Sequence, residues 1–389
     1  MTDYLVNAER ILADLVGFQT ITGKPNDKII GYIKDYLEKL DIHVALDPHR
    51  DGKRFNLLAT IGSRKDDGII LSGHTDVVPA ETEGWSSNPF KLRKADGRLF
   101  GRGTVDMKGF LAVILALAPK FKSVEKNLKT PVHFALTFDE EEGTFGAAQM
   151  GNFLKRLGLT PKAAIVGEPT GMLPYNGHKG GLELIAEIRG SSGHASDPRG
   201  KVNALYYAAR LISFIEKVGK ELAKLPISNS EYNPPYTTLS VGYIKGGEAR
   251  NVIPGYCEFK WEVRPIGNDG HLVLKRVQDF VADDLQKEMQ NIDNNTGIEL
   301  IEVAYCPSLI VTESSFAASL IERLWTNAKP SVLSFGTDGA HYQSFGIDTI
   351  IFGPGDMKLM HKQDEYIEIS AINDAILFMK KLLIYCQEN

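Results

Sequence analysis

Cysteine is scarce in this chain of 389 residues, which contains only Cys257, Cys306 and Cys386. The three are widely spaced, so the sequence offers neither a disulfide framework nor the paired spacing of a thiolate zinc site. We expect them to be small buried hydrophobic residues. Their scarcity favours a reducing, cytoplasmic compartment.

Long apolar runs are also missing. The longest, Phe110–Ala118, is far too short to span a lipid bilayer. The first ten residues lack a basic segment followed by an apolar stretch, so we expect no secretory signal there. The sequence therefore predicts a protein without a membrane partner.

A surplus of positive charge is the third absence. Lysine and arginine number 44 against 49 aspartates and glutamates, which gives a net charge of −5. A nucleic-acid-binding protein would be expected to carry a basic stripe, so we expect no nucleic-acid partner. The length suits two domains, each with its own hydrophobic core.

The order of apolar patterns predicts an α/β protein with an insertion. Over the first 180 residues, short strand patterns alternate with helical ones, which is typical of a mostly parallel sheet flanked by helices. Residues 181–306 instead read β-α-β-β-α-β, the ferredoxin-like order, with strands that leave one face wet or free for a partner subunit. We expect residues 1–180 and 307–389 to form one domain and 181–306 another.

The segment Ile69–Asp76, Ile-Ile-Leu-Ser-Gly-His-Thr-Asp, joins a buried-strand pattern to two polar residues. In an extended chain, His74 and Asp76 project to the same side. Open α/β sheets bind ligands at the carboxyl ends of their strands. An imidazole held by a nearby carboxylate is typical of a metal-binding histidine. A polar turn at a strand end remains the alternative.

Further acids and a histidine stand at the ends of predicted elements. Asp106 begins a helix, Asp139–Glu142 and Glu168 follow strands, and His361 lies in a late loop. Four consecutive acids repel one another unless a cation offsets them, although a solvated charge run is the common alternative. Imidazole and carboxylate ligands suit zinc, cobalt or manganese. Two histidines and three carboxylates suffice for two ions, and a further carboxylate could act as general base.

Five motifs in this order resemble one enzyme family. They are His74-Thr-Asp76, Gly103-Thr-Val-Asp-Met-Lys-Gly109, Asp139-Glu-Glu141, Gly167-Glu-Pro-Thr170 and His361-x-x-Asp-Glu365. Together they resemble the metallohydrolases that include acetylornithine deacetylase, succinyl-diaminopimelate desuccinylase, aminoacylase and glutamate carboxypeptidase. The resemblance implies a zinc-exopeptidase-like catalytic domain with an inserted ferredoxin-like domain that acts as a lid and forms a homodimer.

The same resemblance implies a role for each motif. Two Zn²⁺ ions would be bound, with Co²⁺ possible. One would be held by His74 and Glu168, the other by Glu141 and His361, with Asp106 bridging them. Asp76 would orient His74, and Glu140 would be the general base. The register within Asp139–Glu142 stays open, because the roles could shift by one residue.

The inserted domain also carries family signatures. The loop Gly190–Pro198 resembles the lid loop whose histidine reaches the partner subunit's site. By that resemblance His194 would hydrogen-bond the oxyanion of the tetrahedral intermediate; a turn histidine among glycines is the alternative. Asn251 and Arg264 resemble substrate-binding positions, and an arginine fork suits a substrate carboxylate.

Near the end of the chain, Gly336 and Thr337 resemble a loop that lines the substrate site, with a structural turn as the alternative. His341 has no motif support, and we treat it as structural although it lies beside that loop. Asp338 is a departure, because the deacetylases more usually carry a Thr-Glu pair here. This difference affects the prediction of which substrate amine the enzyme selects, and it does not affect the prediction of hydrolytic chemistry.

Three features resemble the acetylornithine deacetylase branch: Asp364 in the last motif, the lid loop continuing to Asn203, and Ala340-His341 after the Thr-Asp-Gly sequence. We therefore expect an enzyme that removes the acetyl group from N2-acetyl-L-ornithine in arginine biosynthesis. A succinyl-diaminopimelate desuccinylase, a general N-acyl-amino-acid hydrolase or a peptidase remains an alternative. A catalytically inactive binding relative is the alternative from another class.

Overall fold

The computed structural model describes residues 2–62, 67–81, 83–227 and 230–389. It divides the chain into two compact units. Unit 1 comprises Met1–Gly177, Val311–Ser331 and Thr337–Asn389, and unit 2 comprises His178–Ile310 and Val332–Gly336. The sequence predicted a single insertion over 181–306, and the lid and dimerisation roles of that insertion stay predictions.

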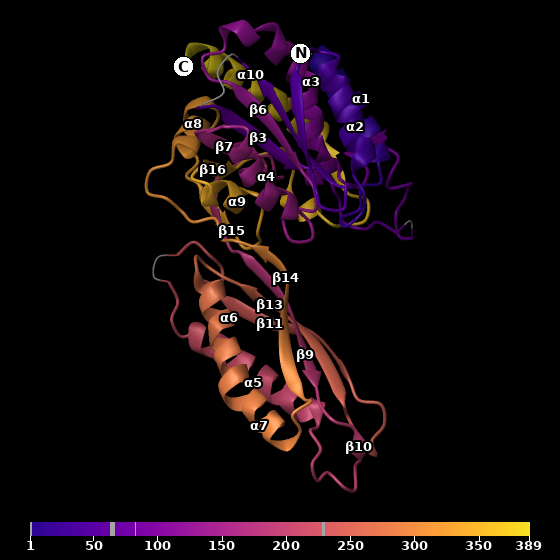
Figure 1. The fold of residues 1–389 in the computed structure, drawn as a ribbon. Helices are drawn as coiled ribbons and strands as arrows, with labels where there is room; N and C mark the ends of the chain where they lie inside the picture. The colour runs from indigo at the N-terminus through magenta and orange to yellow at the C-terminus, as the bar shows by residue number, and fades with distance from the viewer. Residues whose placement is uncertain (1, 63–66, 82, 228–229) are drawn as a thin grey trace. The chain divides into compact units, whose positions relative to one another are not determined.

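Unit 1 is built on an eight-stranded sheet (Figure 1). In spatial order the strands are β1 (His43–Pro48), β2 (Phe55–Ile61), β6 (Val132–Thr137), β3 (Ile69–His74), β7 (Ala163–Val166), β16 (Asp348–Ile351), β8 (Tyr175–His178) and β15 (Ser331–Leu333). The pairs β3–β6, β3–β7 and β7–β16 are parallel. Every residue of β3, β6 and β7 is buried, as expected for strands covered on both faces.

Helices cover both faces of this sheet. They are α1 (Thr2–Gly17), α2 (Asp27–Glu38), α3 (Gly109–Ser123), α4 (Phe145–Arg156), α8 (Phe316–Leu324), α9 (Gly339–Ser344) and α10 (Ile369–Glu388). α4 and α9 lie over one face, and α1, α3 and α10 pack together over the other (Figure 1). α3 is apolar on every side and buried from Gly109 to Ala118, so it forms the centre of that layer.

A small three-stranded sheet lies outside the main one. Its order is β17 (Tyr366–Glu368), β5 (Arg98–Phe100) and β4 (Arg93–Ala95). β17 and β5 are antiparallel, so the chain that follows the last predicted motif runs beside the chain that precedes Asp106. This pairing joins Tyr366 to Phe100 and Glu368 to Arg98, from opposite ends of the chain, and could not be read from local patterns.

Unit 2 has the predicted ferredoxin-like arrangement. Its antiparallel sheet has the order β11 (Thr238–Gly246), β13 (Tyr256–Arg264), β9 (Gly181–Arg189) and β14 (Gly297–Cys306). Two helical segments, α5 (Ala204–Leu222) and the run α6 (Asp269–Phe280), η3 (Val281–Leu285) and α7 (Gln286–Ile292), accompany it. Alternate residues of β9, from Leu182 to Ile188, are buried, so these helices cover one face of the sheet. β10 (Gly193–His194) pairs with β12 (Val252–Ile253).

Several predicted boundaries shift for local reasons. The apolar spacing of residues 142–157 predicts a helix from Glu142, but α4 begins at Phe145, because Thr144 takes a left-handed backbone angle (φ 56°). The apolar spacing of residues 313–327 predicts a helix over that range, but α8 spans only Phe316–Leu324, and the Ser315 hydroxyl accepts the N–H of Ala318 as its cap. The short helix α9 had no periodic signal and was not predicted.

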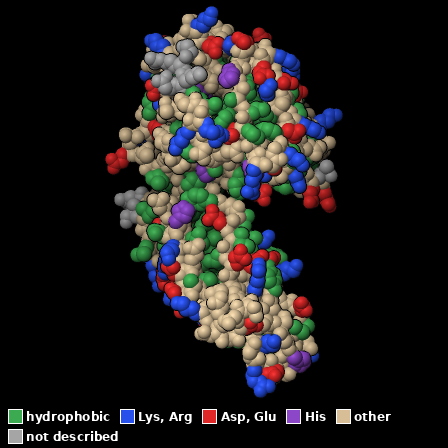
Figure 2. Space-filling model, in the orientation of Figure 1, with side chains coloured by type: hydrophobic (Ala, Val, Ile, Leu, Met, Phe, Trp, Pro, Cys, Tyr) green, Lys and Arg blue, Asp and Glu red, His purple; other side chains and the backbone are tan. Residues whose placement is uncertain are grey.

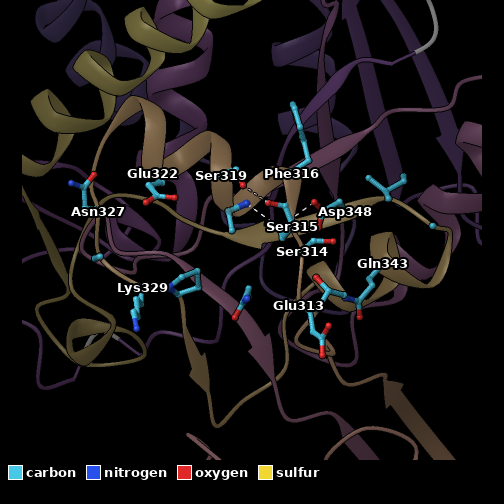
Figure 3. A pocket seen from close by; sticks show the side chains of 17 residues that line it. Glu313, Ser314, Ser315, Phe316, Ser319, Glu322, Asn327, Lys329, Gln343 and Asp348 are labelled. Atoms are coloured by element: carbon cyan, nitrogen blue, oxygen red, sulfur yellow. Dashed lines mark hydrogen bonds between the residues drawn. The ribbon is translucent and has the colours of Figure 1, made fainter.

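The surface is mixed in charge. On the face of each unit drawn in Figure 2, acidic and basic side chains are interspersed. A pocket of about 940 Å³ opens beside the start of α8 in unit 1 (Figure 3). Ser315 and the N–H of Ala317 both donate to Asp348 there, and no predicted metal or substrate residue lines it. No helix in the described part of the chain is long and apolar enough to cross a membrane.

Candidate metal centre

The carboxyl ends of three neighbouring strands meet at one edge of the main sheet. His74 is the last residue of β3 and lies in register with Thr137, the last residue of β6. Ser72 of β3 lies in register with Val166, the last residue of β7. The parallel pairing therefore brings His74, the acid run after β6 and Glu168 after β7 to the same place.

Two groups of three residues form there, and each could hold a metal ion. One contains His74, Asp106 and Glu168, and the other contains Asp106, Glu141 and His361. Within each group the ligand atoms lie within 4.8 Å of one another. Asp106 Oδ1 is 3.1 Å from His74 Nε2, and Asp106 Oδ2 is 3.1 Å from His361 Nε2. Each oxygen of one carboxylate thus faces a different group, as a bridging ligand requires.

The charges of the two histidines are tied to the acids around them. Burial opposes protonation of His74, but its interactions with Asp106 and Asp76 outweigh burial and raise its pKa well above the usual value. Hydrogen bonds to Asp106 and Glu141 raise the pKa of His361 to about 10. The same two imidazoles hold the pKa of Asp106 below its ordinary range despite burial.

The remaining carboxylates repel one another. Burial, followed by the charge of Asp106, raises the pKa of Glu141 to about 7 and that of Glu168 well above its usual value. Glu168 Oε1 is buried and accepts no hydrogen bond from the described residues. Buried acids of this kind are expensive without a cation. The nitrogen and oxygen donors therefore fit a pair of divalent ions such as zinc, cobalt or manganese.

Asp76 was predicted to orient His74, and in the structure it also contacts the backbone of the acid run. His74 Nδ1 is 3.0 Å from the backbone carbonyl of Asp76 and 3.6 Å from its carboxylate. That carboxylate accepts the N–H groups of Glu140 and Glu141, each at 3.2 Å. Asp76 thus joins the His74 ring to the backbone of the acid run.

The acid run itself divides between different neighbours. Asp139 pairs with Arg54 and accepts the N–H of Gly23 at 2.9 Å, and it belongs to neither ligand group. Glu141 Oε2 is 2.9 Å from His361 Nε2. Glu140 belongs to neither group, and burial together with Glu168 raises its pKa well above the usual value. This division matches the register that assigns Glu141 as ligand and Glu140 as base, both of which stay predictions.

Four predicted substrate and lid residues belong to unit 2: His194, Asn251, Arg264 and Gly336, of which the last is described with the loop before α9. His194 and Asn251 lie at adjoining positions, because the N–H of Ala195 donates to the carbonyl of Asn251 at 2.9 Å. His194 is exposed, with its Nδ1 2.6 Å from Ser196 Oγ. Arg264 pairs with Glu262 at 2.7 Å. Their roles at a substrate site stay predictions.

The loop before α9 contains two more predicted residues. Gly336 is tightly enclosed, since an added Cβ would lie 2.6 Å from Cys306 Sγ. The Thr337 hydroxyl accepts the N–H of Gly339 at 3.1 Å. Asp338, which the sequence placed in the same site-lining loop, is buried and accepts the Thr137 hydroxyl at 2.6 Å, and burial raises its pKa to about 7. This hydrogen bond connects the start of α9 to the end of β6.

His341 was treated as structural, and the structure gives it a position near the acid run. The side chain is buried, and its Nε2 lies 2.7 Å from the Thr144 hydroxyl. The N–H of Thr144 in turn donates to the carbonyl of Glu140 at 3.2 Å. His341 thus braces the loop that carries the predicted base. Only its place after the Thr-Asp-Gly sequence could have signalled this.

Comparisons with known proteins identify the family of the chain. The model of peptidase family M20/M25/M40 matches residues 70–385. Acetylornithine deacetylase of Proteus mirabilis is 31% identical over 363 residues, which cover 93% of this chain and 90% of that protein. Acetylornithine deacetylase of Shigella sonnei is 32% identical over 345 residues, covering 88% and 86%.

Solved structures share the fold. A tripeptidase of Staphylococcus aureus superposes with a TM-score of 0.74 at 20% identity, covering 99% of both chains. A dinuclear metal-binding M20 peptidase of Bacillus subtilis gives a TM-score of 0.66 at 17% identity, covering 100% of this chain and 99% of that one. With the family match, these likenesses establish that the chain belongs to the M20/M25/M40 peptidase family and is a metallohydrolase that acts on amides.

Proposed function

We propose that this enzyme hydrolyses N2-acetyl-L-ornithine to L-ornithine and acetate, a step of arginine biosynthesis. The observation that carries the chemistry is the shared Asp106 carboxylate between two histidine-containing groups, with Glu140 beside them in neither group. The substrate is supported by the acetylornithine deacetylases that are similar over most of the chain. The scarcity of cysteine supports a cytoplasmic location.

The proposed site holds two Zn²⁺ or Co²⁺ ions. His74 and Glu168 would hold one, Glu141 and His361 the other, and Asp106 would bridge them. Two such ions would polarise the amide carbonyl and lower the pKa of the attacking water. Glu140 would accept the proton of that water and return it to the leaving nitrogen, and its raised pKa suits a base that must also act as an acid.

Unit 2 would complete the enzyme as the lid of a homodimer. We propose that His194 hydrogen-bonds the developing oxyanion in the site of the partner subunit. Asn251, Arg264, Gly336 and Thr337 would bind the substrate, with the arginine fork facing the α-carboxylate. These roles are supported by the family motifs quoted above.

A second candidate is hydrolysis of another amide of the same class. Asp338 stands where the deacetylases usually carry glutamate, which favours testing succinyl-diaminopimelate, other acetylated amino acids and a dipeptide. The deciding measurement is kcat/KM on this panel with added Zn²⁺ or Co²⁺. We expect acetylornithine to be preferred by at least about tenfold. A larger kcat/KM on any other member would replace the proposed substrate and leave the hydrolytic chemistry standing.

A further inference from the structure

Glu365, the last residue of the last motif, has no role in the ligand scheme, yet it is only 1% exposed. Its carboxylate accepts four hydrogen bonds from one short segment. Oε2 accepts Arg102 Nη1 at 2.7 Å and the N–H of Gly103 at 3.1 Å. Oε1 accepts the N–H of Val105 at 2.9 Å and the N–H of Asp106 at 3.3 Å. One of these donors belongs to the shared carboxylate residue itself.

The segment that Glu365 binds cannot satisfy these groups alone. Gly103 has a left-handed backbone angle (φ 81°), and Asp106 is non-helical (φ −125°, ψ 93°) just before α3. Their N–H groups therefore lack the carbonyl partners that a regular helix would supply. Buried N–H groups need acceptors, and the Glu365 carboxylate provides them. The backbone position of Asp106 thus depends on a residue from the other end of the chain.

Glu365 also fixes the loop that carries His361, four residues earlier. Its carbonyl accepts the N–H of Gly101 at 3.0 Å. The neighbouring Asp364 carboxylate accepts the N–H and hydroxyl of Ser86, each at 2.9 Å. His361 itself is about half exposed and has a left-handed backbone angle (φ 60°), so packing contributes little to its position.

We propose that Glu365 is a positioning residue that holds Asp106 and the His361 loop in one arrangement, and thereby controls binding of the ion held by Asp106, Glu141 and His361. The proposal rests on the two-ion site of the proposed function, but not on the acetylornithine substrate. Two of the three ligands in that group are placed by segments that meet at this carboxylate. The group of His74 and Glu168 shares only Asp106 with it.

Only a carboxylate of this length fits the four donors. Glutamine would turn an NH₂ group towards donors, and would leave the charge of Arg102 buried without a partner, which is strongly destabilising. Glu365→Asp keeps the charge but shortens the reach by one methylene. The double variant Arg102→Met/Glu365→Gln removes both charges together. These two variants disturb the position of Asp106 without stranding a buried ion.

A matched control lies three residues further on. Glu368 pairs with Arg98 at 2.8 Å across the same β17–β5 strand pair, but both side chains are 42% exposed. Glu368→Gln therefore removes an Arg–Glu pair of the same chemistry without touching Asp106. An exposed pair of this kind contributes little.

The test is stepwise titration of the metal-free full-length protein with Co²⁺, followed by calorimetry and visible absorption, with a thermal melt of each metal-free variant. We assign the weaker of two Co²⁺ equivalents to the group of Asp106, Glu141 and His361, because His361 is half exposed. We expect Glu365→Asp and the double variant to bind that equivalent about 10- to 100-fold less tightly. The tighter equivalent shares Asp106 but not the His361 loop, so it should weaken by a smaller factor, and Glu368→Gln should match the wild type. Two unchanged equivalents in folded variants would overturn the proposal. So would an equal loss of both, or failure of both variants to fold, because Glu365 would then be a purely structural residue.

The outcome is separable from that of the proposed function. Failure of the protein to prefer acetylornithine would change the substrate and leave the Co²⁺ titration as it stands. Conversely, Co²⁺ titrations of the Glu365 variants that match the wild type would show that Glu365 does not position the ligands, whichever substrate is preferred.

Discussion

The two ligand groups use the same chemistry on very different supports. The strand-borne group, His74, Asp106 and Glu168, is buried at the carboxyl ends of β3 and β7 and the start of α3. The loop-borne group, Asp106, Glu141 and His361, depends on the turn after β6 and on a late loop. His74 is fully buried, whereas the side chain of His361 is 48% exposed. The sheet positions the first group, and loop contacts position the second.

This difference should appear as a difference in metal affinity. A preformed site loses little conformational freedom on binding, whereas a half-exposed loop must be ordered. We therefore expect the strand-borne group to bind its ion first and the loop-borne group to bind the weaker equivalent. The variants below test this comparison, beginning with the largest expected effect.

Glu140→Gln should separate chemistry from metal binding in both groups. The variant keeps the shape of the side chain but removes the proposed base, so kcat should fall by about 10³- to 10⁴-fold. Metal content should stay at the wild-type value, because Glu140 belongs to neither group. Kinetics on the best substrate and metal analysis provide the measurement. A near-normal kcat would remove Glu140 from the role of base.

His194→Ala should lower activity without affecting either group. Loss of an oxyanion donor should reduce kcat by about 10²- to 10³-fold, and metal content should not change. Ser196→Ala, which removes the hydroxyl partner of His194 Nδ1 and keeps the backbone N–H of residue 196 beside it, is the milder companion variant. Loss of metal from the His194 variant would show that the lid assignment is wrong.

His74→Ala and His361→Ala compare the two supports directly. His361→Ala should weaken one metal equivalent by about 100-fold. It should lower the melting temperature of the metal-free protein less than His74→Ala does, because the side chain is half exposed although it pairs with Asp106 and Glu141. His74→Ala should weaken the tighter equivalent and also lower the melting temperature, because it leaves a buried cavity and unpaired acids. Equal effects on both melting and affinity would refute the distinction between the groups.

His133 tests whether the acids or the sheet determine the charge of His74. It lies in β6, beside β3, and is equally buried, but burial alone lowers its pKa to about 4. Its folded pKa is thus below the unfolded value near 6.5, so the unfolded state binds more protons between these values. Its contribution is complete above about pH 6.5 and is lost as the pH falls towards 4.

At pH 5 this titration should cost the metal-free wild-type protein about 2 kcal/mol of unfolding free energy relative to pH 8. His133→Gln should lose this part of the pH dependence, although it will be less stable at every pH, because the ring packs in the sheet. Urea unfolding of both proteins between pH 4.5 and 8 provides the measurement. Parallel pH profiles would show that His133 is not the group responsible.

Much of the fold could be predicted because local patterns specify it. The apolar runs of β3, β6 and β7 and the apolar helix α3 are continuous, so their type and approximate bounds follow from periodicity. β17 is only three residues long and pairs with β5 from the other end of the chain, so no window of sequence could reveal it. β4 and β5 are equally short but form a local hairpin across Asp96-Gly97, a turn signal that the sequence contains, although the pair was not predicted. α9 is likewise too short to show a helical period.

The sequence by itself determined which polar residues follow the strand patterns. Parallel strands have their carboxyl ends at one edge of the sheet, so these residues could be expected to lie near one another. The acids and histidines His74, Glu141, Glu168 and His361 could therefore be nominated before any contact was known. Their part in binding metal stays a prediction for the experiments above.

Only the tertiary structure decided how these residues divide. Arg54 draws Asp139 away from the site, Asp76 holds the backbone of the next two acids, and Asp106 offers one oxygen to each histidine. The four hydrogen bonds that Glu365 accepts from residues 102–106 are likewise visible only in the tertiary structure. The partners of these residues come from segments up to about 260 residues apart in the chain. Burying a charge or an N–H without a partner is unfavourable, and only the tertiary structure brings these partners together.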